Sequence, residues 1–135
     1  MPNQWNSYLE LVELAKDQGD FTKQERYATL LGENVLAALS RADVVPSLKG
    51  TGCEVAGAAI YFVPTEGANA KERALRWIEQ SIEFAPTANR YFKLGLAWKS
   101  QDTTNETTAQ NAHNAFGTAL TLDPGHQGAI HHSSV

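Results

Sequence analysis

Apolar residues recur at spacings of three and four along most of the chain, a period that places them on one face of a helix. The first such segment covers residues 3–18, and we expect it to end near Gly19 with a two-residue turn after it. A second helix is predicted to follow to about Ala42, and Thr22-x-x-Glu25 at its start has the form of a capping box. The apolar face of this helix is predicted to contain Ala28, Leu31, Val35 and Leu39.

Four further helices are predicted from start signals and prolines. Residues 43–51 contain one proline and one glycine, with Gly52 directly after them, and we expect a longer connection there. The third helix is then expected to be capped by Thr51-x-x-Glu54 and to end at Val63, before a proline. The later helices are expected to run from Asn69-x-x-Glu72 through Phe84, from after Thr87 to about Ser100, and from Thr103-x-x-Glu106 to about Leu122.

The tail over residues 125–135 is short and rich in glycine, so we expect no seventh helix in it. The prediction is therefore an all-α fold of six helices in a single domain over residues 1–135. Stacked helical units need a terminal element with a polar outer face. Because no such helix is predicted, we expect the end of the stack to be covered by a second copy, a partner chain or the tail folded back.

The stretch from Cys53 to Pro124 contains one pattern written twice at an offset of 38 residues. Apolar character also repeats at this offset, as with Ile78 and Phe116. A period in this range is typical of stacked supersecondary units, here a helix, a loop and a second helix closed by proline. The identical residues are Gly57 and Gly95, Ala59 and Ala97, Thr65 and Thr103, Ala74 and Ala112, and Pro86 and Pro124.

The last unit resembles a tetratricopeptide repeat, whose pattern is W-x2-L-G-x2-Y, then A-x3-F, then P. It contains Tyr91-x2-Leu94-Gly95-x2-Trp98, Ala112-x3-Phe116-x2-Ala119 and Leu122-Asp123-Pro124. The preceding unit is a weaker match, with Cys53-x2-Ala56-Gly57-x2-Ile60, Ala74-x3-Ile78-x2-Ser81 and Pro86. The period exceeds the family's usual one of about 34 residues. We attribute the surplus to extended loops over residues 64–70 and 101–106.

The resemblance implies a right-handed α-solenoid of antiparallel helix pairs. Its units are a degenerate repeat 1 at about 4–42, the connection 43–51, repeat 2 at about 52–86, repeat 3 at about 87–124 and the tail 125–135. It also implies a non-enzymatic module without a cofactor that binds a peptide segment of a partner protein in a concave groove. An adaptor, or an assembly or secretion chaperone, would act in this way.

Residues off the packing positions of the first helix in each pair are the candidates for that groove. An apolar centre flanked by lysines would suit a peptide with an apolar anchor and an acidic group. The candidates are Lys16, Glu54, Tyr61, Phe92, Leu96 and Lys99, with Val12 as a further possibility on the first helix. The alternative for Phe62 and Phe92 is a place in the core between repeats. Trp77, Ile78, Trp98 and Phe116 are predicted to be core residues.

Some members of the family clamp a C-terminal carboxylate with Lys, Arg and Asn side chains of their first helices. Asn89 and Lys93 stand near two of those places. Glu54 and Val55 occupy the repeat in which an amide is required. The clamp is therefore incomplete.

Composition and charge narrow the class of partner. The net charge is −4 and the isoelectric point is about 5.5, so bulk electrostatics do not favour nucleic acid or an anionic membrane. No run of apolar residues is long enough to span a bilayer, and the N-terminus lacks the pattern of a signal peptide. The single cysteine, Cys53, is expected to be a buried, inert thiol. We expect a cytoplasmic location, with no nucleic-acid or membrane partner.

Two other functions stay open. The chain could be a self-associating structural unit, for example a homo-oligomer formed through an uncovered C-terminal repeat. It could also be a small metal-binding protein, because imidazole groups bind zinc or copper. No second cysteine and no acidic residue at ligand spacing accompanies the tail histidines, and no Ser/His/Asp set is identifiable, so we expect no enzyme. The histidines are His113, His126, His131 and His132.

Overall fold

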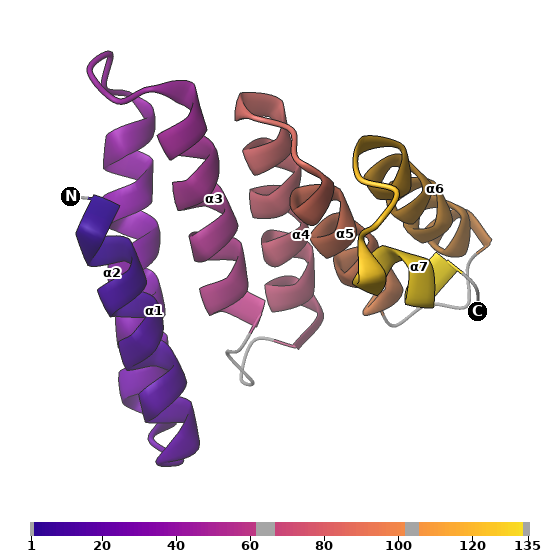
Figure 1. Cartoon of the computed structure of the whole chain (residues 1–135). Helices are drawn as coiled ribbons and strands as arrows, with labels where there is room; N and C mark the ends of the chain where they lie inside the picture. The colour runs from indigo at the N-terminus through magenta and orange to yellow at the C-terminus, as the bar shows by residue number, and fades with distance from the viewer. Residues whose placement is uncertain (1, 62–66, 102–105, 134–135) are drawn as a thin grey trace.

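The computed structural model describes residues 2–61, 67–101 and 106–133 and is all-helical over these ranges. Its helices follow one another along the molecule in chain order, and consecutive helices run in opposite directions (Figure 1). The all-α prediction is confirmed. The helices are α1 (Pro2–Asp17), α2 (Phe21–Leu39), α3 (Pro46–Tyr61), α4 (Gly67–Phe84), α5 (Ala88–Lys99), α6 (Glu106–Leu122) and α7 (Gln127–Ser133).

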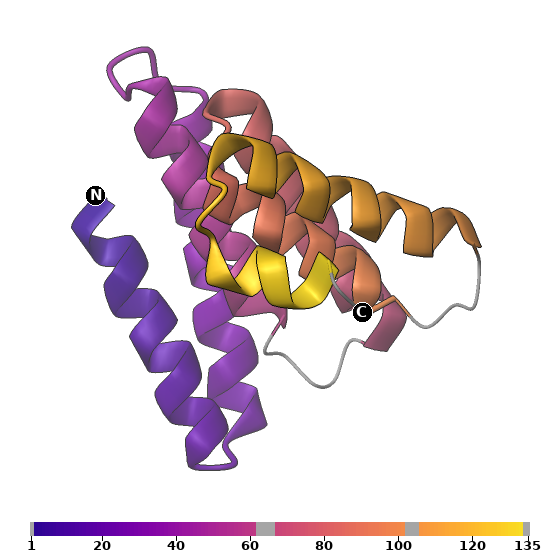
Figure 2. The same cartoon turned by 45° about the vertical axis from the view of Figure 1, so that its right-hand side comes forward.

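Neighbouring helices supply most of the packing. The helices α1 and α2 form one closely packed pair, α3 and α4 a second, and α5 and α6 a third. The first pair is joined to the second because both α1 and α2 contact α3, and the second is joined to the third through α4 and α5. The short helix α7 packs on α6 and closes the C-terminal end (Figure 2).

The turn between α1 and α2 forms where the sequence places it, but its cap differs from the prediction. Gly19 has a φ of 72°, a left-handed conformation that glycine adopts without strain. Asp20 is the N-cap of α2, and its Oδ1 atom accepts a hydrogen bond of 3.1 Å from the backbone N–H of Lys23. The capping box expected from Thr22 and Glu25 is therefore wrong, because the helix has already begun at Phe21.

The connection predicted over residues 43–51 is shorter than expected, because α3 already starts at Pro46. Proline is well suited to the first position of a helix, where its missing N–H has no partner to lose. Glycines 50 and 52, which suggested a loop, lie inside α3 and make room for neighbours. A Cβ atom at position 50 would lie 2.7 Å from Nη1 of Arg90, and one at position 52 would lie 2.9 Å from the ring of Trp5.

The start signals of the other helices give a mixed result. Thr51 is not a cap, because it lies within α3 and donates its hydroxyl hydrogen bond to the Ser47 carbonyl at 3.1 Å. The α4 helix begins at Gly67, so residues 67–70 are helical rather than loop and Asn69 does not start the helix. Thr87 does cap α5, accepting a 3.1 Å hydrogen bond from the N–H of Arg90. Residues 64–66 and 102–105, with Thr103, lie outside the described residues.

The offset of 38 residues recurs in the structure. The helices α4 and α6 end at Phe84 and Leu122, two ends that have this separation. Matched positions also make the same contact. A Cβ atom at position 57 would lie 3.2 Å from Ile78, and one at position 95 would lie 2.5 Å from the Phe116 ring. The helices of both pairs therefore approach most closely at the same glycine position.

The expected count of six helices is wrong, because residues 127–133 of the tail form α7. Its Ala129 is fully buried. A Cβ atom at position 128 would lie 2.7 Å from the Phe92 ring, so the glycine that argued against a helix is what lets α7 approach α5. Of the coverings expected for the end of the stack, the tail folded back is the one observed.

The core runs along the contacts between helices. Ile78 and Phe116 are buried, as predicted, whereas Trp77 and Trp98 are half-buried and pack against the edge of the core. Val12, a possible groove residue from sequence, is fully buried and belongs to the core instead. The largest cluster lies between α1, α2 and α3 and contains Trp5, Val12, Ala28, Leu31, Val35, Ala38, Cys53, Ala56 and Ala59.

The close approach of α5 and α6 can be tested by adding one methyl group. Gly95→Ala would push a Cβ atom into the Phe116 ring, and we expect it to lower the free energy of unfolding by roughly 1–3 kcal/mol. Gly117→Ala on the same pair is the control, because a Cβ atom there meets nothing within 4 Å. That substitution should raise stability by up to about 1 kcal/mol. Urea denaturation followed by circular dichroism measures both, and equal effects would contradict the packing.

Candidate functional site

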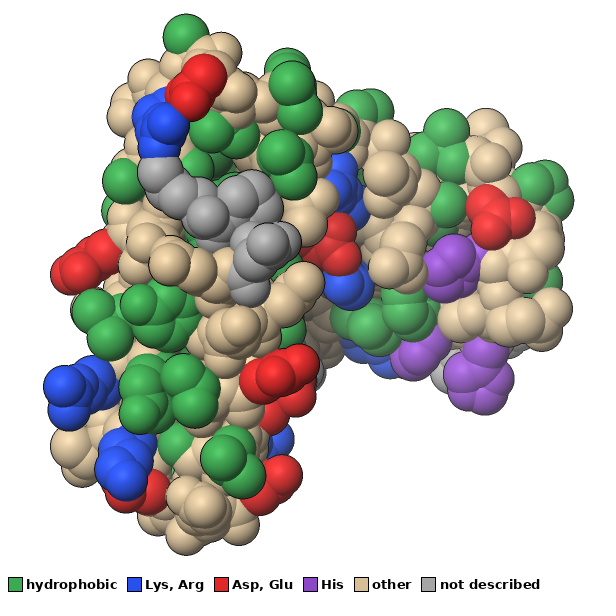
Figure 3. All heavy atoms as spheres, turned by 60° about the vertical axis from the view of Figure 1, so that its left-hand side comes forward, with side chains coloured by type: hydrophobic (Ala, Val, Ile, Leu, Met, Phe, Trp, Pro, Cys, Tyr) green, Lys and Arg blue, Asp and Glu red, His purple; other side chains and the backbone are tan. Residues whose placement is uncertain are grey.

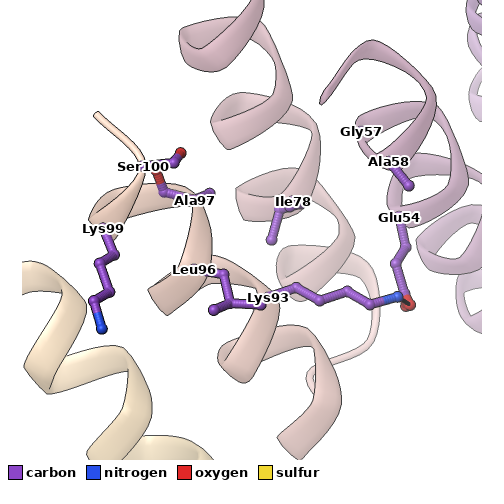
Figure 4. Close-up of a pocket in the computed structure, with 9 residues that line it drawn as sticks. All are labelled: Glu54, Gly57, Ala58, Ile78, Lys93, Leu96, Ala97, Lys99 and Ser100. Atoms are coloured by element: carbon purple, nitrogen blue, oxygen red, sulfur yellow. Dashed lines mark hydrogen bonds and ion pairs between the residues drawn. The ribbon is translucent and has the colours of Figure 1, made fainter. Parts of the chain in front are cut away.

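A pocket of about 440 Å³ lies between α3 and α5, with α4 behind it. Figure 4 shows side chains of the two outer helices facing each other across it, and Ile78 of α4 between them. Most of the lining is apolar, and charged side chains stand at its edges. The lining residues are Glu54, Gly57, Ala58, Ile78, Lys93, Leu96, Ala97, Lys99 and Ser100.

The pocket is open because small residues occupy the facing positions of α3 and α5. A Cβ atom at Gly57 would lie 3.2 Å from both Ile78 and Trp77, so this glycine draws α3 toward α4 rather than toward α5. Ala58, one position on, lies beside the pocket and is too short to fill it. Leu96 and Ala97 of α5 provide the opposite wall. The short side chains thus leave a space between α3 and α5, and α4 lies behind that space.

A buried ion pair closes one end of the pocket. Arg90 of α5 has a side chain only 7% exposed, and its Nε atom donates to Oε1 of Glu54 on α3 at 2.8 Å. Its Nη1 atom donates to the Ala85 carbonyl, and Nη2 donates to the Thr51 hydroxyl at 3.2 Å. Lys93 donates to the other carboxylate oxygen of Glu54. Two cations thus share one carboxylate, which leaves one net positive charge at this end.

Arg90 and Lys93 stabilise the ionised form of Glu54. Burial by itself raises the pKa of Glu54, and the hydrogen bonds from Lys93 and Arg90 more than offset this, so that the pKa is lowered from its usual value of 4.5. The ion pair is therefore fully formed above about pH 4.5 and is lost only as the pH falls through the lower value of the folded protein.

Lys99 stands at the other end of the pocket. Its aliphatic chain lines the rim, and its amine points away from Ile78 and Glu54 (Figure 4). The Nζ atom lies 3.3 Å from Nδ1 of His132 on α7. The helix α7 thereby fixes the direction of a charge at the edge of the pocket.

The structure brings three of the six groove residues predicted from sequence together, namely Glu54, Leu96 and Lys99. Lys16 is exposed on α1 and does not line the pocket. Phe92 is half-buried against α7, with its ring centroid 4.8 Å from that of His126 and 6.0 Å from that of Phe116. The side chain of Tyr61, and Phe62 as a whole, lie outside the described residues.

Gly57 and Ser100 line the pocket but were not selected as groove residues from sequence. Sequence reasoning sought large side chains as binding residues, whereas this pocket exists because small ones leave space. The signal that could have found it is the run of small residues from Ala56 to Ala59 on a first helix. The two residues near the places of a carboxylate clamp have other partners, because Lys93 pairs with Glu54 and Asn89 lies 3.3 Å from His126.

Metal binding finds no support in the described parts of the chain. No group of three or more His, Cys, Asp or Glu side chains there is arranged to hold a metal ion. Of the tail histidines, His126 and His132 face α5, and His131 is exposed. The helices that can be searched also include none that is long and apolar enough to cross a bilayer.

No protein-family model, curated protein or solved structure matches this chain. The site therefore has to be interpreted from its own geometry: an apolar pocket between two helices, with a net positive charge at one end and Lys99 at the other.

Replacing Glu54 tests the ion pair. Glu54→Gln leaves the buried guanidinium of Arg90 without its carboxylate, and we expect a loss near the lower end of the roughly 3–5 kcal/mol typical of a broken buried pair, because Glu54 is 19% exposed. Urea denaturation at pH 7 measures it. The difference from wild type should shrink as the pH falls below about 4.5.

Asp43→Asn is the matched control for Glu54→Gln. Its carboxylate pairs with Arg41 at 2.6 Å, but the two side chains are 65% and 41% exposed. Solvent screens such an exposed pair, so we expect Asp43→Asn to change stability much less than Glu54→Gln does. If both substitutions lower the free energy of unfolding by the same amount, the Glu54 pair stabilises the fold no more than an exposed ion pair does.

Cys53 is fully buried, and burial raises its pKa to about 11. We therefore expect its thiol to react with a disulfide reagent at pH 8 only after the core between α1, α2 and α3 has opened. The labelling rate should rise steeply with urea. Cysteine placed at the exposed position 109 in a Cys53→Ala background is the control and should react at once. Complete labelling of native Cys53 within the same time would show an accessible thiol.

Proposed function

We propose that this chain is a non-enzymatic interaction module that binds a peptide segment of a partner protein in the pocket between α3 and α5. The observation that carries the proposal is the pocket itself: about 440 Å³, walled by Ala58, Leu96 and Ala97, with Ile78 at its back. A space of this size takes one or two apolar side chains of a bound segment. Concave, mainly apolar sites with a few polar groups are the usual form of a binding site.

The charges at the two ends favour an acidic segment. At one end the two positive charges of Arg90 and Lys93 and the negative charge of Glu54 leave a net charge of +1. Lys93 is 36% exposed there. At the other end Lys99 is exposed. A peptide with an apolar residue flanked by aspartate or glutamate would place its apolar side chain in the pocket and its carboxylate near one of these lysines. We propose this as the chemistry of the partner.

A tetratricopeptide-like right-handed solenoid is the architecture we propose for this module. Three features support it: the ends of α4 and α6, which lie at the offset of 38 residues, a glycine contact at the same position of two pairs, and packing mainly between helices adjacent in the chain. In such a stack the first helices of successive pairs line a common groove, and α3 and α5 are two of them. An adaptor or an assembly chaperone would use the groove in this way.

Self-association is the second candidate, and a specific surface favours it. Exposed apolar side chains gather on α1 and α2 at the N-terminal end (Figure 3), among them Leu11, Leu14, Phe21 and Leu36. The C-terminal end is a weaker choice for such contacts than the sequence suggests, because α7 packs over it. Sedimentation at increasing protein concentration distinguishes this candidate from a monomeric peptide binder.

One substitution in the wall of the pocket can fill it. Ala58→Trp places a large ring in the space, whereas Ala37→Trp, the control, adds the same ring at an exposed position of α2. Displayed random peptides selected on the wild type provide the probe, and we expect the selected sequences to combine an apolar residue with aspartate or glutamate. Their affinity should fall by about tenfold or more in Ala58→Trp, a loss of about 1.4 kcal/mol, and stay unchanged in Ala37→Trp.

Thermal unfolding of both variants checks that each is folded. Selected peptides that bind Ala58→Trp as well as the wild type would move the site away from the pocket. If selection on the wild type yields no peptide that binds, the proposed function is wrong. Lys99→Glu adds a test of the charge, since it should weaken acidic peptides and leave neutral ones unaffected.

A further inference from the structure

The helix α7 is held by aromatic contacts that include two histidines. The ring of His132 stacks on that of Phe116, with centroids 5.3 Å apart, and lies 5.7 Å from that of Phe92. His126 stands at the other end of α7, and its ring centroid lies 4.8 Å from that of Phe92. Figure 3 shows histidine side chains gathered at this end of the molecule. Two titratable groups therefore take part in the contact between a short helix and the third pair.

The hydrogen bonds of His126 require a neutral ring. His126 stands directly before α7, and its Nδ1 atom accepts a 3.1 Å hydrogen bond from the backbone N–H of Ala129, which makes it the N-cap of the helix. Its Nε2 atom faces Oδ1 of Asn89 at 3.3 Å and donates to it. A second proton on the ring would sit on Nδ1, where it would face the N–H of Ala129, and the cap would be lost.

The position of His132 also requires a neutral ring. Lys99 has donors only, so the 3.3 Å contact between its Nζ atom and Nδ1 of His132 is a hydrogen bond in which the imidazole accepts. A protonated His132 would place two positive charges at this distance and would have no acceptor to offer.

We propose that α7 is a pH-sensitive cap, docked on α5 and α6 while His126 and His132 are neutral and released when they bind protons, which exposes the rings of Phe92 and Phe116. The helix has seven residues, and only Ala129 among its described residues is fully buried. The aromatic face beneath it is then free for contact with another molecule.

The other charged groups around α7 act in the same direction at His132. The groups near it are Lys99 of α5 and His131 of α7, and both disfavour a further positive charge. On α6, Glu106 and His113 are exposed. Asp123, in the turn before α7, is the acidic group on the side of His126, and its Oδ1 atom already accepts the N–H of Gly125 at 3.1 Å. Arg90 and Lys93 of α5 are engaged with Glu54.

The direction of the pKa shift agrees with this geometry. Desolvation first, and then Lys99 and His131, lower the pKa of His132 from its usual value of 6.5. A base whose pKa is lower when docked binds more protons when released. Docking is thus fully favoured above about pH 6.5 and weakens as the pH falls from there to the lower value of the docked state.

Amide hydrogen exchange measures docking directly. Protection factors at Ala129 and Ile130, whose N–H groups bond to the ring and the carbonyl of His126, report on α7, and those at Leu31 and Val35 in the core of α2 serve as the internal reference. Below about pH 6.5 we expect the α7 values to fall by at most about tenfold per pH unit for each proton taken up, while they and the reference change little between pH 7.5 and 6.5.

Two substitutions should abolish the pH dependence. His132→Phe keeps a ring on Phe116 and cannot be protonated, and His126→Asn keeps an N-cap oxygen that does not titrate. The double variant should hold its α7 protection at pH 5. His113→Gln is the control and should behave as the wild type does, because His113 is exposed on α6. Gly128→Ala gives the released reference at every pH, since its Cβ atom would lie 2.7 Å from Phe92.

Wild-type protection that does not change with pH would overturn the proposal, and so would a double variant that loses protection as the wild type does. If the α7 protection factors of the double variant equal those of Gly128→Ala at both pH values, the substitutions themselves have released α7 for steric reasons. Only the wild type then tests the proposal. The ring resonances of His126 and His132 then have to titrate with the same midpoint as the loss of protection. Different midpoints would sink the proposal, and a common one supports it.

Discussion

The buried guanidinium of Arg90 is the interaction on which the arrangement of the second and third helix pairs depends. Removing such a charge from water costs several kcal/mol, and the cost is offset only where its donors find acceptors. Here they find Glu54 and Thr51 of α3 and the carbonyl of Ala85 after α4. One side chain of α5 thus binds two other segments. Gly50 is part of the same arrangement, because any side chain there would occupy the place of the guanidinium.

The pocket follows from this arrangement together with the glycine contacts. Arg90 and Lys93 hold α3 and α5 at a fixed separation through Glu54, while Gly57 lets α3 lie close against α4. Beyond the ion pair the facing residue of α3 is Ala58, which cannot span the gap. A space is therefore left where two rigid contacts set the helices apart. Such a site is preformed, so binding would require little reordering of the protein.

The sequence predicted the features that depend on local or periodic signals. Periodicity gave the helices, the 38-residue offset gave the matched pairs, and Thr87 gave one cap correctly. Prediction from the sequence failed where a residue is needed for a contact with another residue far away along the chain. Glycine lowers helix propensity, so Gly50 and Gly128 were interpreted as loop residues, whereas they admit Arg90 and Phe92. The pocket was predicted only in part for the same reason: it is defined by absent side chains, and nothing local distinguishes those from ordinary packing.

Lys99 physically connects the pocket with α7. Its aliphatic chain lines the pocket, and its charge is directed to His132 on the other side. Two like charges at such a distance repel by about 1 kcal/mol even in water and by more where the solvent is excluded. A proton on His132 would therefore disfavour the present direction of the lysine, whose flexible, exposed chain can turn toward the pocket rim or the solvent. The electrostatic field at the pocket would then depend on the state of the last helix, although none of the described lining residues belongs to α7.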